Sequence, residues 1–345
     1  AARHHGIVPI DVVAVNLYPF VKTARSIASD EEIIEQMDIG GPAMVRAAAK
    51  NHAHVLIVVN PARYGDVIAA LKSGKPDPGL RRSLAAEAIR HTAAYDGAIA
   101  AYLTGGDKAF PAESALSLTK VSELRYGENP HQRGVLYRDP LAPAGGVASA
   151  EVLSEGKGLS YCNWLDLDAA WQGAWELSPR TEPVCVIVKH AIPCGAALGR
   201  SAADALARAW ATDPVSAYGS VVAANVPLDA EALEALAAPD HFVEAVIAPG
   251  FDEKALAELT GRRKNLRILR SQAPDPAGRL EWRILSGGAL AQDADRASWD
   301  PAKMTVPTKA KPQKEIAMDL EFAWRLVKQV RSNAIALAKD RAAVG

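Results

Sequence analysis

A lysine and a histidine stand side by side in the segment VCVIVKHAIPCG (184–195). The five apolar residues before them have the length of a buried strand, so Lys189 and His190 fall where that strand ends. Ligands of open α/β sheets gather at the carboxyl ends of strands, which makes the pair a candidate for acid–base chemistry. Successive strand residues face opposite sides, so the pair can address one substrate only if the strand breaks or bulges, and we expect the Pro-Cys-Gly turn at 193–195 to break it.

Two other interpretations of this segment are open. In one, Lys189 extends to solvent and His190 bonds to a neighbouring loop, an ordinary arrangement at a strand end. In the other, the histidine and the Pro-Cys turn form a zinc site of the nucleotide deaminase type, whose signature is H-x-E followed by P-C-x-x-C. Ile192 and Ala197 stand where that signature requires glutamate and the second cysteine. A zinc deaminase is therefore disfavoured.

The composition is that of a globular protein with enough length for two domains: 345 residues, 49% hydrophobic and 23% charged, with a net charge of −1. This charge balance predicts neither nucleic acid nor membrane partners. Apolar runs such as 55–59 are far shorter than the roughly 20 residues that span a bilayer, and no secretory signal is visible. Three cysteines without metal-ligand spacing argue against a disulfide framework and for a reducing compartment, so we expect a cytoplasmic protein.

Hydrophobic periodicity predicts an α/β fold in two regions. The first has a βαβ rhythm, with strands at 12–16 and 54–60, helices at 30–37, 42–50 and 61–72, and one long helix or two consecutive helices at 79–103, broken near 95–97. Glycines, a proline and a Ser/Thr-rich stretch then indicate a linker. The second region has predicted strands at 184–188, 220–224, 244–248 and 266–269, helices at 166–177, 201–211, 230–237, 252–260 and 318–332, and loops at 270–280 and 300–313.

Seven motifs occur in one order along essentially the whole chain: VVAVNLYPFVKT (12–23), QMDIGGPAMVRAAAKNH (36–52), HTAAYDGAI (91–99), LRYGENPHQRG (124–134), LSYCNWLDLDAAW (159–171), VIVKHAIPCG (186–195) and QVRSNAIALAKD (329–340). The chain thereby resembles the bifunctional purine biosynthesis enzymes, which join an IMP cyclohydrolase domain to an AICAR transformylase domain. The resemblance implies a parallel-sheet, methylglyoxal-synthase-like cyclohydrolase domain at 1–108, a linker at 109–122, and a cytidine-deaminase-like α/β transformylase domain at 123–345.

The resemblance also implies the activity. A formyl group passes from 10-formyltetrahydrofolate to the amine of AICAR, and the formyl compound is closed to IMP with loss of water. The folate is a cosubstrate and no metal is required. The partners are small nucleotide and folate molecules, and the assembly is a homodimer.

In the first domain the resemblance assigns catalysis to Tyr18, Asp38 and Lys50 and substrate binding to Asn16 and Asn51. A phenol, a carboxylate and an ammonium are chemically sufficient for a ring closure that expels water. Pro19 biases Tyr18 toward an extended conformation at a strand end. Structural roles stay open: Tyr18 as a core aromatic, Asp38 as a helix cap, and Lys50 as part of a solvated stripe.

In the second domain the resemblance assigns formyl transfer to Lys189, His190 and Asn333. His190 suits removal of the amine proton, and Lys189 suits stabilisation of the developing oxyanion. Tyr218 is expected to face the pterin. The residues expected to bind AICAR are Arg125, Tyr126, Asn163, Gly219 and Glu244, the last at a position where some relatives carry aspartate.

Both ends of the sequence look cut. Family members have an opening strand and glycine-rich phosphate loops before the first motif, and further transformylase residues after the last one. We therefore expect both domains to be incomplete in this chain. A non-catalytic nucleotide-binding protein that keeps the motifs is a further alternative.

Overall fold

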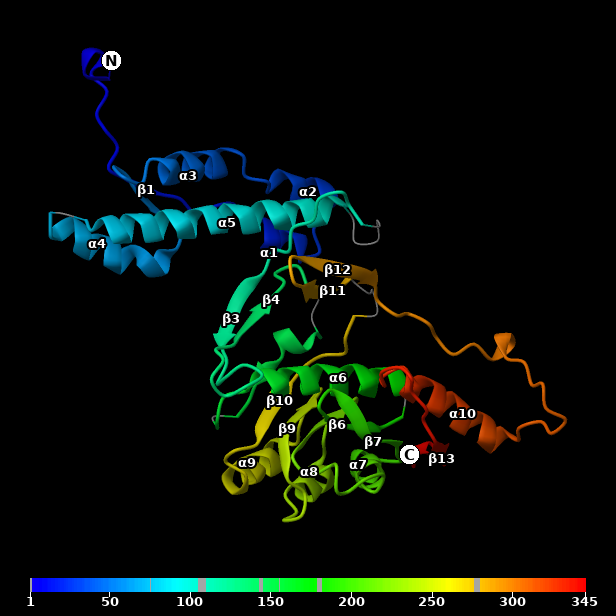
Figure 1. Cartoon of the computed structure of the whole chain (residues 1–345). Coiled ribbons are helices and arrows are strands. Elements are labelled where there is room, and N and C mark those ends of the chain that lie inside the picture. Colours follow the sequence, from blue (N-terminus) through cyan, green and yellow to red (C-terminus); the bar gives the residue numbers. More distant parts are fainter. Residues whose placement is uncertain are drawn as a thin grey trace. The chain divides into compact units, whose positions relative to one another are not determined.

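The structure is a computed structural model that describes residues 2–74, 76–104, 110–142, 145–154, 156–178, 182–275 and 280–345 (Figure 1). The chain forms two compact units. Unit 1 consists of residues 1–119 and 139–142, and unit 2 of residues 120–138 and 143–345. The predicted boundary at 108 lies among residues 105–109, outside the described ones, and the last part of the predicted linker belongs to a strand that starts at Thr119.

Unit 1 contains a two-stranded parallel sheet with Val13 opposite Ile57. Its strands are β1 (Val12–Ala14) and β2 (Leu56–Val58), shorter than the predicted ranges. Ile57 is fully buried beside Val45 and Ala88, because the apolar sides of two helices pack on β2. The helical elements are η1 (Ala2–His5), α1 (Phe20–Ala24), α2 (Asp30–Glu35), α3 (Gly40–Lys50), η2 (Pro61–Arg63), α4 (Tyr64–Lys72) and α5 (Pro78–Thr104).

Helix α5 is a single helix of 27 residues and continues through Gly97, where the sequence permitted a break. The helix is held there by tertiary packing, since Tyr95 and Ala98 are buried against Phe20 and Ile33. The rings of Phe20 and Tyr95 lie 6.2 Å apart in an edge-on arrangement. Burial of this aromatic pair outweighs the low helix propensity of one glycine, which costs roughly 1 kcal/mol relative to alanine.

The described residues of unit 2 form an eight-stranded sheet in the order β13-β14-β7-β6-β8-β9-β10-β5. Strands β8, β9 and β10 are mutually parallel, whereas β6 is antiparallel to both β7 and β8. The sheet is therefore mixed. Its strands are β5 (Glu151–Val152), β6 (Val184–Lys189), β7 (Ile192–Leu198), β8 (Ser220–Ala224), β9 (Val243–Ala248), β10 (Arg267–Arg270), β13 (Ala338–Lys339) and β14 (Ala342–Ala343).

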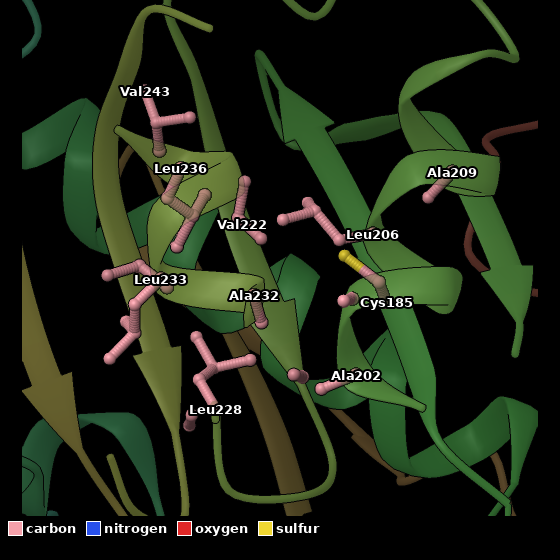
Figure 2. Close-up of a cluster of buried hydrophobic side chains, with 14 of the residues drawn as sticks. Cys185, Ala202, Leu206, Ala209, Val222, Leu228, Ala232, Leu233, Leu236 and Val243 are labelled. Atoms are coloured by element: carbon pink, nitrogen blue, oxygen red, sulfur yellow. The ribbon is translucent and has the colours of Figure 1, made fainter. Parts of the chain in front are cut away.

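Helices cover both faces of this sheet. Because strand side chains alternate, Cys185 and Ile187 of β6 face one cluster of buried residues while Val186 and Val188 face another. Figure 2 shows part of the first cluster, in which Leu206 lies beside Cys185 and the leucines of α8 pack over β8 and β9. The helical elements of unit 2 are η3 (Val147–Ser149), α6 (Tyr161–Leu177), α7 (Ala202–Trp210), α8 (Ala230–Leu236), α9 (Glu253–Arg262), η4 (Pro301–Lys303) and α10 (Lys314–Val327).

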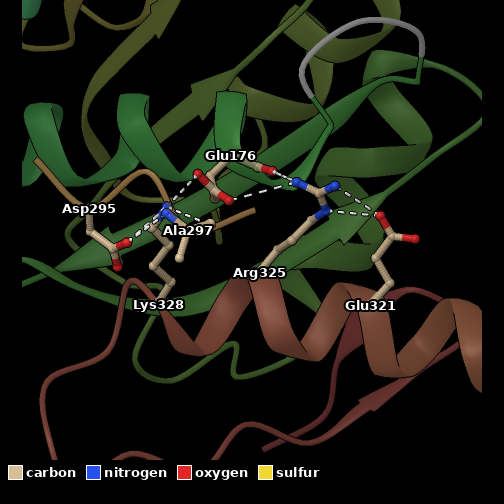
Figure 3. Close-up of polar contacts among 6 residues, drawn as sticks. All are labelled: Glu176, Asp295, Ala297, Glu321, Arg325 and Lys328. Atoms are coloured by element: carbon tan, nitrogen blue, oxygen red, sulfur yellow. Dashed lines mark hydrogen bonds and ion pairs between the residues drawn. The ribbon is translucent and has the colours of Figure 1, made fainter. Parts of the chain in front are cut away.

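Helix α10 is joined to α6 by a partly buried ion-pair network (Figure 3). The Arg325 guanidinium bonds to Glu321 at 2.9 Å on its own helix and to the backbone oxygen of Glu176 at 3.2 Å. Lys328 Nζ lies 3.2 Å from Glu176 Oε2 and 3.9 Å from Asp295. The Arg325 guanidinium is also 3.7 Å from the Glu176 carboxylate, so this glutamate has two cationic partners, one in α10 and one directly after it.

Two antiparallel hairpins complete the unit. One pairs β3 (Thr119–Glu123) with β4 (Val135–Arg138), and the other pairs β11 (Leu280–Leu285) with β12 (Gly288–Asp293). Periodicity had not indicated the second hairpin, and its side chains are mostly exposed. None of the described helices is long and apolar enough to cross a membrane.

One prediction about the Lys-His segment is wrong. Pro193, Cys194 and Gly195 do not form a turn but lie inside β7, where Gly195 pairs with Ile187. The chain turns earlier, at His190 and Ala191, whose φ angles are +55° and +58°. Gly195 suits a strand here because a Cβ atom would lie 2.2 Å from the Ala209 backbone oxygen, so α7 can pack directly against the strand.

Candidate functional site

Several predicted transformylase residues, among them Lys189, His190 and Glu244, lie at one edge of the sheet of unit 2. Strand β6 runs opposite to β8, with Val188 opposite Val221, so the carboxyl end of β6 lies next to the amino ends of β8 and β9. The rule that ligands gather at the carboxyl ends of strands applies to mostly parallel sheets. Here β6 is antiparallel to its neighbour β8, so its carboxyl end meets the amino ends of other strands. Polar residues of α6 reach this edge, since Asn163 bonds to Glu244 and Asp166 bonds to the Ala191 N–H.

Lys189 and His190 contact different neighbours. The Lys189 ammonium donates a hydrogen bond to the backbone oxygen of Tyr218, 2.8 Å away, in the segment that precedes β8. His190 is exposed, and the next residue, Ala191, donates its backbone N–H to the Asp166 carboxylate of α6 at 2.6 Å. The register of β6 against β7 shifts between Ile187 and Val188, so a bulge of the kind expected is present.

Asn163 and Glu244 are directly hydrogen-bonded. Asn163 is buried in the first turn of α6 and forms a capping box with Ser160, and its Nδ2 donates to Glu244 Oε2 at 2.8 Å. Glu244 lies on β9, and its carboxylate is 3.6 Å from the guanidinium of Arg267 on β10. The buried Arg267 also donates to the backbone oxygen of Lys157 at 3.1 Å. Three neighbouring elements thus present a charged, hydrogen-bonded surface.

Arg125 and Tyr126 are attached to the start of α6 by backbone bonds. The Arg125 N–H donates to the Leu159 oxygen, and the Tyr161 N–H donates to the Tyr126 oxygen, both at 3.1 Å. The Arg125 guanidinium lies 4.6 Å from the centre of the Tyr126 ring and donates to its hydroxyl at 2.7 Å. An arginine fork suits a phosphate, because it can bind two oxygens at once.

Gly219 and Tyr218 precede β8. Gly219 has a φ angle of +78°, which a residue with a side chain rarely adopts, and its N–H donates to the Phe242 oxygen at 2.7 Å. The Tyr218 ring is 58% exposed and lies 5.0 Å from the ring of Phe242. An exposed aromatic face at this edge is available for stacking by a planar ligand.

Asn333 lies in the segment between α10 and β13, and its side chain is exposed. Among the described residues, no hydrogen bond joins it to Lys189, His190 or the Asn163–Glu244 pair. The expected role of Asn333 in formyl transfer therefore stays a prediction that rests on the resemblance.

In unit 1, Asp38 lies at the centre of a small hydrogen-bond network. Its carboxylate accepts from the backbone N–H of Gly41 at 2.7 Å and of Tyr18 at 3.3 Å. A Cβ at Gly41 would lie 2.5 Å from Asp38 Oδ2, so a larger residue there would displace this carboxylate. The buried Tyr95 hydroxyl accepts from the Asp38 N–H at 2.8 Å and donates to the Gln36 oxygen at 2.9 Å. Burial raises the pKa of the Tyr95 phenol, so it stays protonated and acts as this bridge.

The remaining cyclohydrolase predictions divide between two ends of unit 1. Asn16 follows β1 closely, at the same strand end as Tyr18, and is exposed. Lys50 and Asn51 lie at the far end of α3 from Asp38, and the chain passes from there to the amino end of β2. Eleven helical residues span about 16 Å, so Lys50 is not brought into contact with Asp38.

Burial is the main cause of the shifted pKa values at the sheet edge that holds Lys189 and Glu244. It raises the pKa of the Asp166 carboxyl, which the Ala191 N–H and His190 partly counteract. It lowers the pKa of Arg267, although the nearby Glu244 acts in the other direction. Burial, with the charge of Asp213, raises the pKa of Cys194 to about 11, so this thiol is protonated at neutral pH. Within the described ranges, no three His, Cys, Asp or Glu side chains are grouped as metal ligands.

Sequence reasoning did not single out Asp166, Arg267 or Tyr95. A signal existed for Asp166, which lies three residues after Asn163 and so shares its helix face. Arg267 interrupts the apolar run of a predicted strand, which is unusual for a buried position. For Tyr95 no local signal was present, since its partners lie 57 and 59 residues away.

The chain belongs to the AICARFT/IMPCHase bienzyme family, whose pattern matches residues 48–345. It is 45% identical over 351 residues to the bifunctional purine biosynthesis protein PurH of Rhodopirellula baltica, covering 99% of this chain and 66% of that protein. It is also 45% identical over 349 residues to the PurH protein of Bacillus subtilis, with the same two coverages. The chain thus spans about two thirds of the length of these relatives.

Among solved structures, the crystal structure of ForH matches 29% of this chain and 53% of its own chain, at 33% identity and a TM-score of 0.23.

Proposed function

We propose that the protein transfers a formyl group from 10-formyltetrahydrofolate to the amine of AICAR and then closes the product to IMP with loss of water. These are the last two steps of purine nucleotide synthesis. The observation that carries the proposal is 45% identity along 99% of the chain to relatives named bifunctional purine biosynthesis proteins. The meeting of the Lys189–His190 turn with the Asn163–Glu244 pair at one sheet edge supports it.

In the transfer step, the AICAR amine attacks the formyl carbon. His190 takes the amine proton, and the Lys189 ammonium stabilises the oxyanion that develops on the formyl oxygen. When the carbon–nitrogen bond to the folate breaks, the folate nitrogen takes a proton and leaves as tetrahydrofolate. Lys189 is suited to this role because its bond to the Tyr218 oxygen holds the ammonium at the edge.

The nucleotide would lie along the same edge. Glu244 and Asn163 would bind the base, Arg125 and Tyr126 the ribose phosphate, and the Gly219 backbone would line the site. Tyr218 would stack on the pterin. Asn333 is part of the proposal on resemblance alone, because no hydrogen bond among the described residues joins it to these residues.

In the cyclisation step, the carboxamide nitrogen attacks the formyl carbon and water is expelled. We assign Tyr18 and Asp38 to this step, with Asn16 at the same strand end. Lys50 and Asn51 stay in the proposal on resemblance, although α3 separates them from Asp38.

The domain proposal keeps the predicted ranges: cyclohydrolase at 1–108 with a methylglyoxal-synthase-like fold, a linker at 109–122, and transformylase at 123–345 with a cytidine-deaminase-like fold. The parallel pair in unit 1 and the mixed sheet of unit 2 are compatible with it. We further propose a cytoplasmic homodimer.

The test is an assay of the purified protein with AICAR and 10-formyltetrahydrofolate, in which release of tetrahydrofolate and formation of IMP are followed separately. Cyclisation is measured independently with supplied formyl-AICAR. The proposal predicts both activities. AICAR binding without turnover would instead indicate a nucleotide-binding protein, and stoichiometric zinc with release of ammonia would indicate a deaminase.

A further inference from the structure

The turn that carries His190 has a backbone conformation that its own residues disfavour. Lys189 pairs with Ile192, so His190 and Ala191 are the two central residues of the β6–β7 hairpin, and both have positive φ angles. Two-residue hairpin turns of this kind prefer Asn-Gly or Asp-Gly, because glycine and asparagine tolerate the left-handed region. Histidine is found in this region more often than most residues, but alanine is not, so an interaction outside the turn must favour the conformation of Ala191.

The Asp166 carboxylate supplies such an interaction. Its Oδ1 accepts the Ala191 N–H at 2.6 Å, a short bond of the charge-assisted type. Asp166 is itself held in place, because α6 begins at a capping box and packs against β6 and β8. The contact therefore ties the turn to the helix that also carries Asn163, the proposed base-binding residue.

We propose that Asp166 is a positioning residue for formyl transfer, which holds the His190–Ala191 turn in its left-handed conformation through the Ala191 N–H and so directs His190 at the substrate. This inference rests on the proposed function of the edge. The groups around Asp166 are His190 on the turn, Glu244 on β9, Cys162 on its own helix and Cys194 on β7.

The experiment compares substitutions that differ in whether an acceptor remains. Asp166→Ala removes the acceptor and should lower kcat for formyl transfer by about tenfold to a hundredfold, with the KM for AICAR unchanged within about twofold, because misdirection of one catalytic group has effects of this size. Asp166→Asn keeps an oxygen at the same place and should retain kcat within about threefold. Asp168→Ala is the matched control, since that exposed carboxylate bonds to Gln172 on the same helix.

A second-site variant tests the backbone explanation directly. Glycine adopts the left-handed region without strain, so Asp166→Ala combined with Ala191→Gly should recover a large part of the lost kcat. Hydrogen exchange of the Ala191 amide gives a readout independent of activity, and should be faster in Asp166→Ala than in the wild type or in Asp166→Asn. Impaired cyclisation in Asp166→Ala would indicate misfolding of that variant. In that case Asp166→Ser is used in place of Asp166→Ala, because its side chain is too short to reach Ala191.

Three results would overturn the inference: equal loss of kcat in the Asn and Ala variants, a raised KM with unchanged kcat, or unaltered exchange at Ala191 in the Ala variant. A different result would show that the proposed function itself is wrong. In that case the wild type and Asp168→Ala would themselves show no formyl transfer.

Discussion

The side-chain amide of Asn163 donates a hydrogen bond to Glu244 Oε2 at 2.8 Å, across 81 residues of sequence. The bond joins the first turn of α6 to the amino end of β9, and the ion pair with Arg267 extends it to β10. One carboxylate thus has a neutral donor on one side and a buried cation on the other. Under the proposed function, this carboxylate is the group at the sheet edge that binds the base of AICAR.

Glu244→Gln should weaken AICAR binding by about tenfold, because it removes one charge-assisted hydrogen bond while it keeps the shape of the side chain. The measurement is isothermal titration of the protein with AICAR. The control is Glu231→Gln at the exposed start of α8, which should bind normally. Equal affinity of Glu244→Gln and wild type would show that Glu244 does not contact the base.

His190→Ala should lower formyl transfer by at least about a hundredfold, the effect typical of losing a general base, and should spare cyclisation of supplied formyl-AICAR. The two assays on one preparation measure both activities. Equal loss of the two would indicate misfolding, and full retention of transfer would remove His190 from the mechanism.

Tyr18→Phe should impair cyclisation and leave formyl transfer unchanged, because it deletes a single exposed hydroxyl in unit 1. The backbone bond from Tyr18 to Asp38 is kept in this variant, so the position of the carboxylate should not change. Tyr64→Phe, which removes another partly exposed hydroxyl of the same unit, is the control. Loss of transfer in place of cyclisation would show that the two activities are assigned to the wrong units.

Cys194 should react with iodoacetamide about a hundredfold more slowly at pH 8 than a cysteine in an unfolded peptide. Its pKa of about 11, raised chiefly by burial, leaves little thiolate at that pH, and the thiolate is the nucleophile. The rate should rise about tenfold per pH unit toward pH 10.5, because the thiolate fraction grows in that proportion. Mass spectrometry of the labelled peptide measures the rate, and labelling at the rate of the free peptide would contradict the prediction.

Arg325→Ala should lower the free energy of unfolding by about 1–3 kcal/mol, because a partly buried Glu176 loses one of its two cationic partners. Urea titration measures this change. Lys303→Ala removes a more exposed pair with Asp300 and should cost under about 1 kcal/mol. A smaller effect for Arg325 than for Lys303 would show that the network in Figure 3 contributes little to the attachment of α10.

Several elements of the fold could be predicted from the sequence because their signals are local. The apolar runs at 184–188 and 220–224 appear as strands β6 and β8, since buried strands of an α/β sheet are almost continuously apolar. Helix α7 begins directly after Ser201, as the predicted range 201–211 indicated, and the Ser201 hydroxyl accepts the Asp204 N–H at 3.1 Å. The start of α6 at Tyr161 was placed five residues late, because the Ser160 capping box precedes the first apolar turn.

Other features depended on tertiary structure. An apolar run does not encode the direction of its strand. The antiparallel placement of β6 could therefore not be predicted from the sequence. The same holds for the position of Lys189 beside the amino ends of β8 and β9, which follows from that placement. The turn lies at His190 and Ala191, and not at the predicted residues 193–195, for a related reason. Its left-handed conformation contradicts local preference and is compatible with the contact from Asp166, 25 residues away.

Residue types and motif order were thus sufficient to indicate the family, and the proposed chemistry rests on them, because both depend on which side chains are present. The contacts of Asn163 with Glu244, of Asp166 with Ala191 and of Tyr95 with Asp38 were decided only when the chain folded. Each of these bonds joins residues at least 25 positions apart, and which polar groups meet over such separations is determined by the packing of helices on strands.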